Sequence, residues 1–104
     1  MEELIEETKR IAQARFQTFG FGEAQIEQLL ASGERDLKKE LAHLRELLMQ
    51  EPCDLDAINR SLHALKGLVL NMGNDDAAEK LSELRGSEDP QEKIETLKRL
   101  THIA

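Results

Sequence analysis

His63, Lys66 and Gly67 stand close together in the sequence, and their residue types suit phosphoryl chemistry. If this segment is a helix, with about 100° per residue, Lys66 and Gly67 lie within roughly 60° of His63 on one face. A neutral imidazole can attack an electrophile without an activating base. An ammonium group one turn away would stabilise a dianionic group on the ring and would do little for an acyl group. The three residues together therefore indicate phosphoryl transfer.

The rest of this polar face offers further contacts to a ligand or a partner. Asn59 can form hydrogen bonds, and Arg60 adds a second cation. Leu70 lies roughly 20° from His63 on the helical wheel. A glycine inside a helix costs about 0.5–1 kcal/mol relative to alanine, so Gly67 indicates that something large comes close there. The spacing alone leaves a plainer interpretation open, in which His63 is an ordinary surface histidine and Gly67 a packing glycine.

Metal binding and hydrolysis are less well supported by the same residues. No His, Cys or Asp follows His63 by one helical turn to form a facing pair, and Lys66 would repel a metal ion. No Ser or Cys is evidently paired with His63 as a nucleophile, and a small helical domain offers no wide pocket. We therefore predict no metal site in the chain.

Five helices are expected to position this face, and apolar spacing together with capping residues predicts their bounds. The predicted helices cover residues 3–18, 23–50, 55–72, 75–85 and 90–103. The expected N-caps are Asp54, Asn74 or Asp75, and Asp89; the expected stops are Gly20, Gly73 and Gly86. Short connectors favour antiparallel neighbours. The predicted fold class is all-α, with a single domain over residues 1–104 built as an antiparallel four-helix bundle with an additional short helix.

The longest predicted helix, over residues 23–50, contains the pair Ser32 and Gly33. Because the apolar stripe keeps one phase on both sides of this pair, we favour one helix with a weak point over a fresh start capped by Ser32. This helix is expected to be the main packing partner of the helix over residues 55–72.

Aromatic and histidine residues outside the His63 segment are given structural roles. Phe19 and Phe21, around the turn at Gly20, are expected to plug the end of the core. His43 lies just off the apolar stripe of its helix and His102 lies near the C-terminus, so both are interpreted as surface histidines.

Composition and charge make several classes of function less probable. The chain has 104 residues, and its 14 Lys and Arg are outnumbered by 21 Asp and Glu, for a net charge of −7. Because no basic block is present, nucleic acid is not an expected partner. Cys53 is the only cysteine, so no internal disulfide is expected and a reducing cytoplasm fits. No apolar run approaches the roughly 18 residues of a spanning helix and the N-terminus is acidic, so we expect a soluble, unprocessed cytoplasmic monomer without membrane insertion.

The segment from His63 to Gly73, H-A-L-K-G-L-V-L-N-M-G, resembles the signature of histidine-containing phosphotransfer (HPt) domains, H-x-[hydrophobic]-K-G-x-x-x-x-[hydrophobic]-G. The resemblance extends over about residues 23–86. It implies that His63 accepts a phosphoryl group from the aspartyl phosphate of a receiver domain, in a response regulator or hybrid histidine kinase, and passes it to another receiver of a two-component phosphorelay. Mg²⁺ would be supplied by the receiver, and the domain itself would need no cofactor, bind no nucleotide and have no autokinase activity.

Two features depart from the HPt pattern. Family members usually carry small residues directly after the glycine, where this chain has Leu68, Val69 and Leu70. Leu70 falls on the docking face, where it either gives a more apolar contact with a receiver or obstructs the approach. Many members have Glu or Gln at the position of Arg85. An arginine cannot accept a hydrogen bond from the ring N–H, although it could hold a phosphoryl group.

The leading hypothesis is a phosphorelay intermediate rather than a turnover enzyme, with His63 as phosphoacceptor, Lys66 as charge stabiliser and Gly67 as clearance for the receiver. The residues expected to contact the phosphoryl group or the partner around them are Asn59, Arg60, Leu70 and Arg85. The second hypothesis is an HPt-fold interaction module without relay activity, which binds a receiver or a histidine kinase as scaffold or inhibitor. A hydrolytic or metal-dependent enzyme comes third, because no residue pattern favours it.

Overall fold

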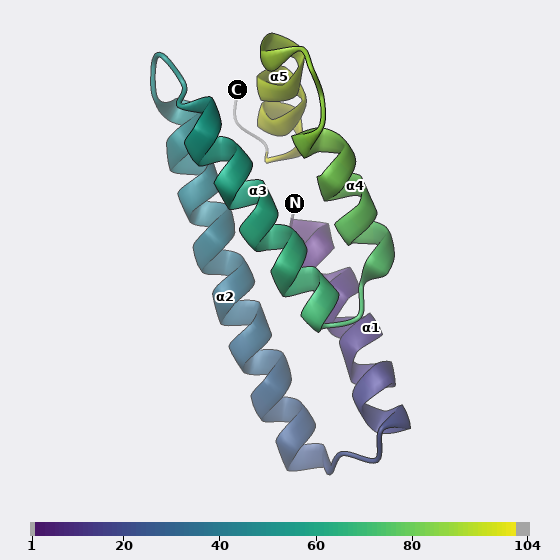
Figure 1. The fold of residues 1–104 in the computed structure, drawn as a ribbon. Helices are drawn as coiled ribbons and strands as arrows, with labels where there is room; N and C mark the ends of the chain where they lie inside the picture. The colour runs from purple at the N-terminus through teal and green to yellow at the C-terminus, as the bar shows by residue number, and fades with distance from the viewer. Residues whose placement is uncertain (1, 102–104) are drawn as a thin grey trace.

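The computed structural model describes residues 2–101, and all regular structure in this range is helical. The helices are α1 (Glu2–Thr18), α2 (Glu23–Met49), α3 (Leu55–Asn71), α4 (Asp75–Arg85) and α5 (Pro90–Leu100). Successive helices run in opposite directions, and α3 lies between α2 and α4 (Figure 1). The predicted all-α class is therefore confirmed for the described residues.

The bounds of α1 to α4 agree with the predicted ranges to within one residue at each end. Side-chain caps explain part of this agreement, because they satisfy backbone N–H groups that a helix leaves free at its first turn. Asp54 accepts a hydrogen bond from the N–H of Ala57 at 3.1 Å at the start of α3. Asp89 accepts one from the N–H of Glu92 at 3.2 Å at the start of α5.

The C-terminal end of α5 differs from the prediction. The helix ends at Leu100, with Thr101 at its C-cap, and not at residue 103. Leu100 is exposed at the last position of the helix. His102 and Ile103 lie outside the described residues.

α2 passes through Ser32 and Gly33 as one continuous helix, as predicted. Packing accounts for the glycine: a Cβ at Gly33 would lie 2.6 Å from the Sδ and Cε atoms of Met72. Met72 is buried directly after α3, and the end of its side chain lies where a Cβ at position 33 would be, so a larger residue there would displace it. The apparent weak point of the sequence is therefore a contact between helices.

The core is centred on α3 and its two neighbours. Its largest fully buried apolar side chains are Leu37, Leu44, Leu48, Ile58, Leu62, Leu65, Val69 and Leu97. The backbone of α3 has more extensive contact with that of α4 than with that of α2, contrary to the prediction of α2 as its main partner. The physical reason is the small size of Ala77 and Ala78, both buried, which lets the backbone of α4 approach closely.

The turn between α1 and α2 does not plug the core with aromatic side chains, and that prediction is wrong. Phe19 is 58% exposed and Phe21 is 37% exposed, with their ring centroids 6.2 Å apart. Leu29, two turns into α2, is exposed as well. At this end α1 and α2 extend beyond α3 and α4, so no other helix covers these side chains (Figure 1).

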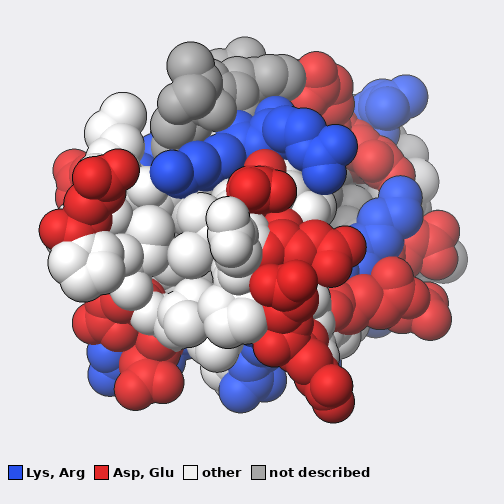
Figure 2. Space-filling view, turned by 90° about the horizontal axis from the view of Figure 1, so that it is seen from above, with Lys and Arg blue, Asp and Glu red and all other residues white. Residues whose placement is uncertain are grey.

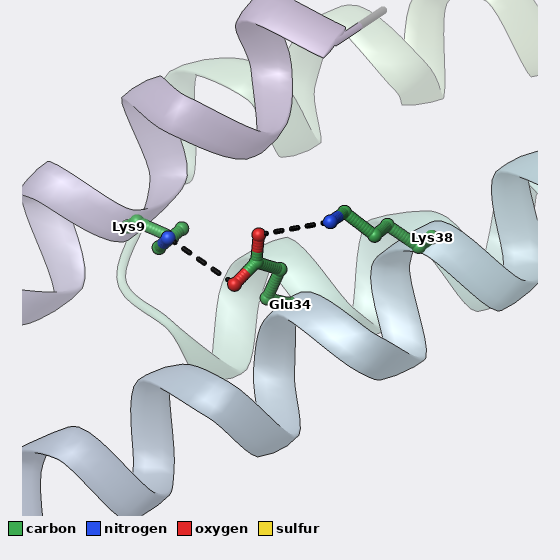
Figure 3. Close-up of polar contacts among 3 residues, drawn as sticks. All are labelled: Lys9, Glu34 and Lys38. Carbon is green, nitrogen blue, oxygen red and sulfur yellow. Dashed lines mark ion pairs between the residues drawn. The ribbon is translucent and has the colours of Figure 1, made fainter.

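Polar contacts tie α1 to the helices beside it. Asn74 caps α4 by accepting a hydrogen bond from the N–H of Ala77 at 3.2 Å, and its amide donates to Thr8 Oγ1 at 2.9 Å. On α2, Glu34 pairs with Lys38 at 3.1 Å and with Lys9 of α1 at 3.2 Å (Figure 3). The hydrogen bonds from Lys38 and Lys9 to the carboxylate lower the pKa of Glu34.

The surface is predominantly acidic where α5 and the turn between α2 and α3 lie. Seen from this end, Asp and Glu side chains cover more of the molecule than Lys and Arg, with uncharged side chains between them (Figure 2). None of the helices within residues 2–101 is both long and apolar enough to cross a membrane.

Candidate functional site

α3 turns one side to the core and the other to solvent. The fully buried positions on its inner side are Ile58, Leu62, Leu65 and Val69. His63 and Gly67 are exposed on the outer side, and Leu70, 41% exposed, lies beyond them as the wheel predicts. The burial of the inner side fixes the rotation of the helix about its axis, so the imidazole is held outside the core on a rigid element.

The ring of His63 meets Arg85, the last residue of α4. Their atoms Nδ1 and Nη1 are 3.4 Å apart. Arg85 follows Ala78 and Leu81 on the same side of α4, and both of these are buried against the core. Because α4 packs closely on α3, this side of the helix delivers the guanidinium to the histidine.

The chemical groups in this contact determine which of them donates the hydrogen bond. A guanidinium group has only N–H donors and no acceptor. The contact is therefore a hydrogen bond only when Nδ1 of His63 carries its lone pair, which in the neutral ring places the hydrogen on Nε2.

Lys93 of α5 belongs to the same region, although sequence reasoning missed it. Its Nζ donates to Asn59 Oδ1 at 3.0 Å and to the backbone carbonyl of Arg85 at 2.8 Å, and the residue is only 6% exposed. An ammonium at the carbonyl end of α4 also interacts favourably with that helix's dipole. The available signal was the placement of this lysine on the apolar stripe of α5, in phase with Leu97.

Lys93 therefore joins three helices close to the histidine. Asn59 precedes His63 by one turn on α3, and the carbonyl of Arg85 ends α4. Asn59 Oδ1 accepts a hydrogen bond from Lys93, and the amide N–H groups of Asn59 remain as donors for a ligand.

Gly67 faces open space. A Cβ built at this position meets no atom within 4 Å, and its backbone conformation is an ordinary helical one. Neither internal packing nor a positive φ angle therefore accounts for a glycine here, in contrast to Gly33. The interpretation of Gly67 as a packing glycine does not fit this geometry.

The remaining cations of this face are uncommitted. Arg60 is exposed and Lys66 is half-buried, and within residues 2–101 neither side chain forms an ion pair. Both are therefore free to interact with an anionic group near His63. His43, the other described histidine, is exposed on α2 as predicted.

The structure thus brings together most of the residues that the sequence singled out. A direct contact joins His63 to Arg85, and Lys93 links Asn59 to Arg85. Arg60, Lys66, Gly67 and Leu70 lie on the same helix as His63 and form no hydrogen bond with its ring in the described part of the chain. Comparisons of the chain with protein-family models, with curated proteins and with solved structures found no match.

Proposed function

We propose that this chain is a phosphorelay intermediate, in which His63 accepts a phosphoryl group from the aspartyl phosphate of a receiver domain and passes it to a second receiver. In this proposal the helices form an HPt-like antiparallel four-helix bundle with an additional short helix. The protein acts as a cytoplasmic monomer, and Mg²⁺ comes with the receiver. The proposal follows from the HPt resemblance of residues 63–73 and from the outer side of α3.

The observation that carries the proposal is the open space at Gly67. A glycine in a helix interior costs about 0.5–1 kcal/mol relative to alanine. No packing contact among residues 2–101 requires that cost here, because a Cβ would touch no atom outside its own stretch of helix within 4 Å. A bulky partner that must bring its phosphoryl group up to His63 supplies the missing reason.

Lys66 supports the same chemistry. Within residues 2–101 it forms no ion pair, and it lies one turn from His63 on the same helix. In the transfer step, a ring nitrogen attacks phosphorus, the N–P bond forms, and the P–O bond to the receiver's carboxylate breaks. The other ring nitrogen keeps or releases its proton to water. The uncommitted ammonium balances the dianionic phosphoryl group on the ring.

A labelling experiment tests this function. The protein is incubated with receiver domains carrying radiolabelled phosphate and Mg²⁺, and acid-labile, base-stable label on the chain is measured. We expect label on the wild type and on His43→Gln, and none on His63→Gln with unchanged helicity by circular dichroism. If no receiver from the same cell labels the wild type, or if His63→Gln keeps the label, the proposal is wrong.

A second candidate function is an HPt-fold interaction module that binds a receiver or histidine kinase without relaying phosphate. The contact of Arg85 with Nδ1 favours it, because a donor occupies the lone pair that a nucleophilic histidine needs. This function predicts that a receiver binds in calorimetry, that Leu70→Asp weakens the binding, and that no label reaches the chain. Transfer of label to His63 would exclude it.

A further inference from the structure

We propose that Arg85 is a positioning residue that sets the tautomer of His63 to the Nε2–H form and so restrains phosphoryl acceptance. The assignment of the tautomer rests on the contact in the structure. Only its kinetic consequence rests on the proposed phosphotransfer function, and the experiment below separates the two.

In its contact with His63, Arg85 can only donate a hydrogen bond. Arg85 Nη1 lies 3.4 Å from His63 Nδ1, and guanidinium nitrogens carry hydrogens but no lone pair for hydrogen bonding. A hydrogen on Nδ1 would face another N–H and a positive charge at this distance. The Nδ1–H form therefore has no partner in this arrangement, whereas the Nε2–H form has one.

The backbone of Arg85 is held in place by Lys93. Its backbone carbonyl accepts a hydrogen bond from Lys93 Nζ at 2.8 Å, and the same ammonium donates to Asn59 Oδ1 at 3.0 Å. Lys93 is buried, so water competes little for these bonds. The end of α4 is therefore tied to α3 one turn before His63, and this fixes the backbone from which the Arg85 side chain reaches the ring.

The contact with Arg85 has a consequence for His63 as a nucleophile. Attack on phosphorus requires a free lone pair on the attacking ring nitrogen. With Arg85 in contact, the lone pair at Nδ1 of His63 faces the guanidinium, and the nitrogen at Nε2 carries the proton. For attack through Nε2, the ring nitrogen that Arg85 does not contact, Arg85 must release Nδ1 and a proton must pass through water from Nε2 to Nδ1. Nε2 can then attack, and the receiver's carboxylate leaves.

Replacing the hydrogen-bond donor at position 85 with an acceptor tests the assignment of the His63 tautomer. The Oε1 atom of Arg85→Gln can accept a hydrogen bond from Nδ1–H, which frees the lone pair of Nε2. Arg85→Lys keeps a positive donor and serves as the matched control. Arg85 is exposed, and circular dichroism checks that each variant retains wild-type helicity.

The first readout is the tautomer itself. Long-range ¹H–¹⁵N correlation spectra of ¹⁵N-labelled protein, recorded where the ring is neutral, report which nitrogen of His63 carries the hydrogen. We expect Nε2–H in the wild type and in Arg85→Lys, and a shift toward Nδ1–H in Arg85→Gln. An Nδ1–H wild type, or identical tautomers in all three proteins, would overturn the assignment.

The second readout is the initial rate of labelling from a phosphorylated receiver. Release of a hydrogen bond of this kind corresponds to roughly a threefold to tenfold change in an equilibrium, so we expect Arg85→Gln to be labelled about threefold to tenfold faster than the wild type. If the tautomer of Arg85→Gln shifts but its labelling rate is unchanged or slower than that of the wild type, the proposal that Arg85 restrains phosphoryl acceptance is overturned. If the tautomer shifts as expected but neither protein is labelled, the phosphotransfer function fails while the tautomer assignment stands.

Discussion

Where α1 meets α2, Lys9 and Lys38 share the carboxylate of Glu34, at 3.2 and 3.1 Å. Where α3 meets α4, Arg85 contacts a histidine ring and Lys93 contacts neutral carbonyl groups, and within residues 2–101 no carboxylate pairs with either cation. Acidic residues are abundant in a chain with a net charge of −7, so their supply does not explain the difference.

The comparison separates two uses of positive charge in one small protein. At the contact between α1 and α2, two ammonium groups share one carboxylate at the surface, and such pairs add little beyond orientation of the two helices. Around His63, no carboxylate within residues 2–101 pairs with Lys66, Arg85 or Lys93. Lys93 is buried and held by two hydrogen bonds, whereas an anionic group that arrives at the histidine would find the ammonium of Lys66 uncommitted.

The largest expected effect is on the rate of labelling, which should differ between a lysine beside His63 and a lysine at the α1–α2 contact. Lys66→Met removes the uncommitted ammonium beside His63, and we expect labelling by a phosphorylated receiver to slow by about tenfold to a hundredfold. Lys38→Met removes a cation of the same type that is already paired with Glu34, and its labelling rate should stay at the wild-type value. Equal rates in the two variants would contradict the comparison.

The next effect concerns stability at the α3–α4 contact. Lys93→Met keeps most of the apolar stem but leaves Asn59 Oδ1 and the carbonyl of Arg85 without their donor. We expect a loss of about 1–3 kcal/mol in the free energy of unfolding, measured by urea denaturation. Lys80→Met, at an exposed position of α4, is the control and should have little effect. A variant at position 93 as stable as the control would show that the buried ammonium does not hold the helices together.

A smaller effect compares the two glycines inside helices. Gly67→Ala adds a methyl group to open space, so the helix should gain about 0.5–1 kcal/mol of stability while receiver labelling slows. Gly33→Ala places its methyl group 2.6 Å from atoms of Met72, and displacement of that buried side chain should cancel part or all of the gain. Thermal unfolding of both variants measures the difference. Equal stabilisation of the two would mean that the Met72 contact does not constrain α2.

The smallest effect is the pH dependence of the α1–α2 contact. The pKa of Glu34 lies below its usual value of 4.5 because of Lys38 and Lys9, so its carboxylate favours the folded state above that pH. This contribution is lost as the pH falls from 4.5 through the lowered pKa. The melting temperature of Glu34→Gln should therefore approach that of the wild type as the solution is acidified. A difference between the two proteins that stays constant from pH 7 to pH 3 would contradict this role.

Much of the fold was predictable because it depends on local signals. Asp54, Asn74 and Asp89 accept backbone hydrogen bonds at the predicted helix starts, and such caps act within a single turn of chain. The continuity of α2 followed from the phase of its apolar stripe. The predictions for Phe19 and Phe21 failed for the opposite reason. A helical wheel gives the direction of a side chain but not the length of the helix that would have to cover it.

Part of the candidate site could likewise be predicted from local signals, and part could not. The outer face of α3, with His63, Lys66, Gly67 and Leu70, could be assigned from spacing, because one helix places all four. The contact of Arg85 with Nδ1 and the burial of Lys93 could not be assigned in this way, since each depends on how α4 and α5 pack against α3. Arg85 entered the candidate set through the HPt resemblance, and Lys93 was missed.

The amino-acid sequence alone specified five helices, the N-caps of three of them and the residues on each face of α3, because hydrogen bonding and apolar periodicity act over short stretches of chain. Tertiary packing alone decided that α3 has more extensive backbone contact with α4 than with α2. It also decided that Met72 occupies the space beside Gly33, whereas Gly67 faces open space. It also decided the polarity of the contact at His63, because a ring nitrogen becomes donor or acceptor only through the group that another helix brings to it.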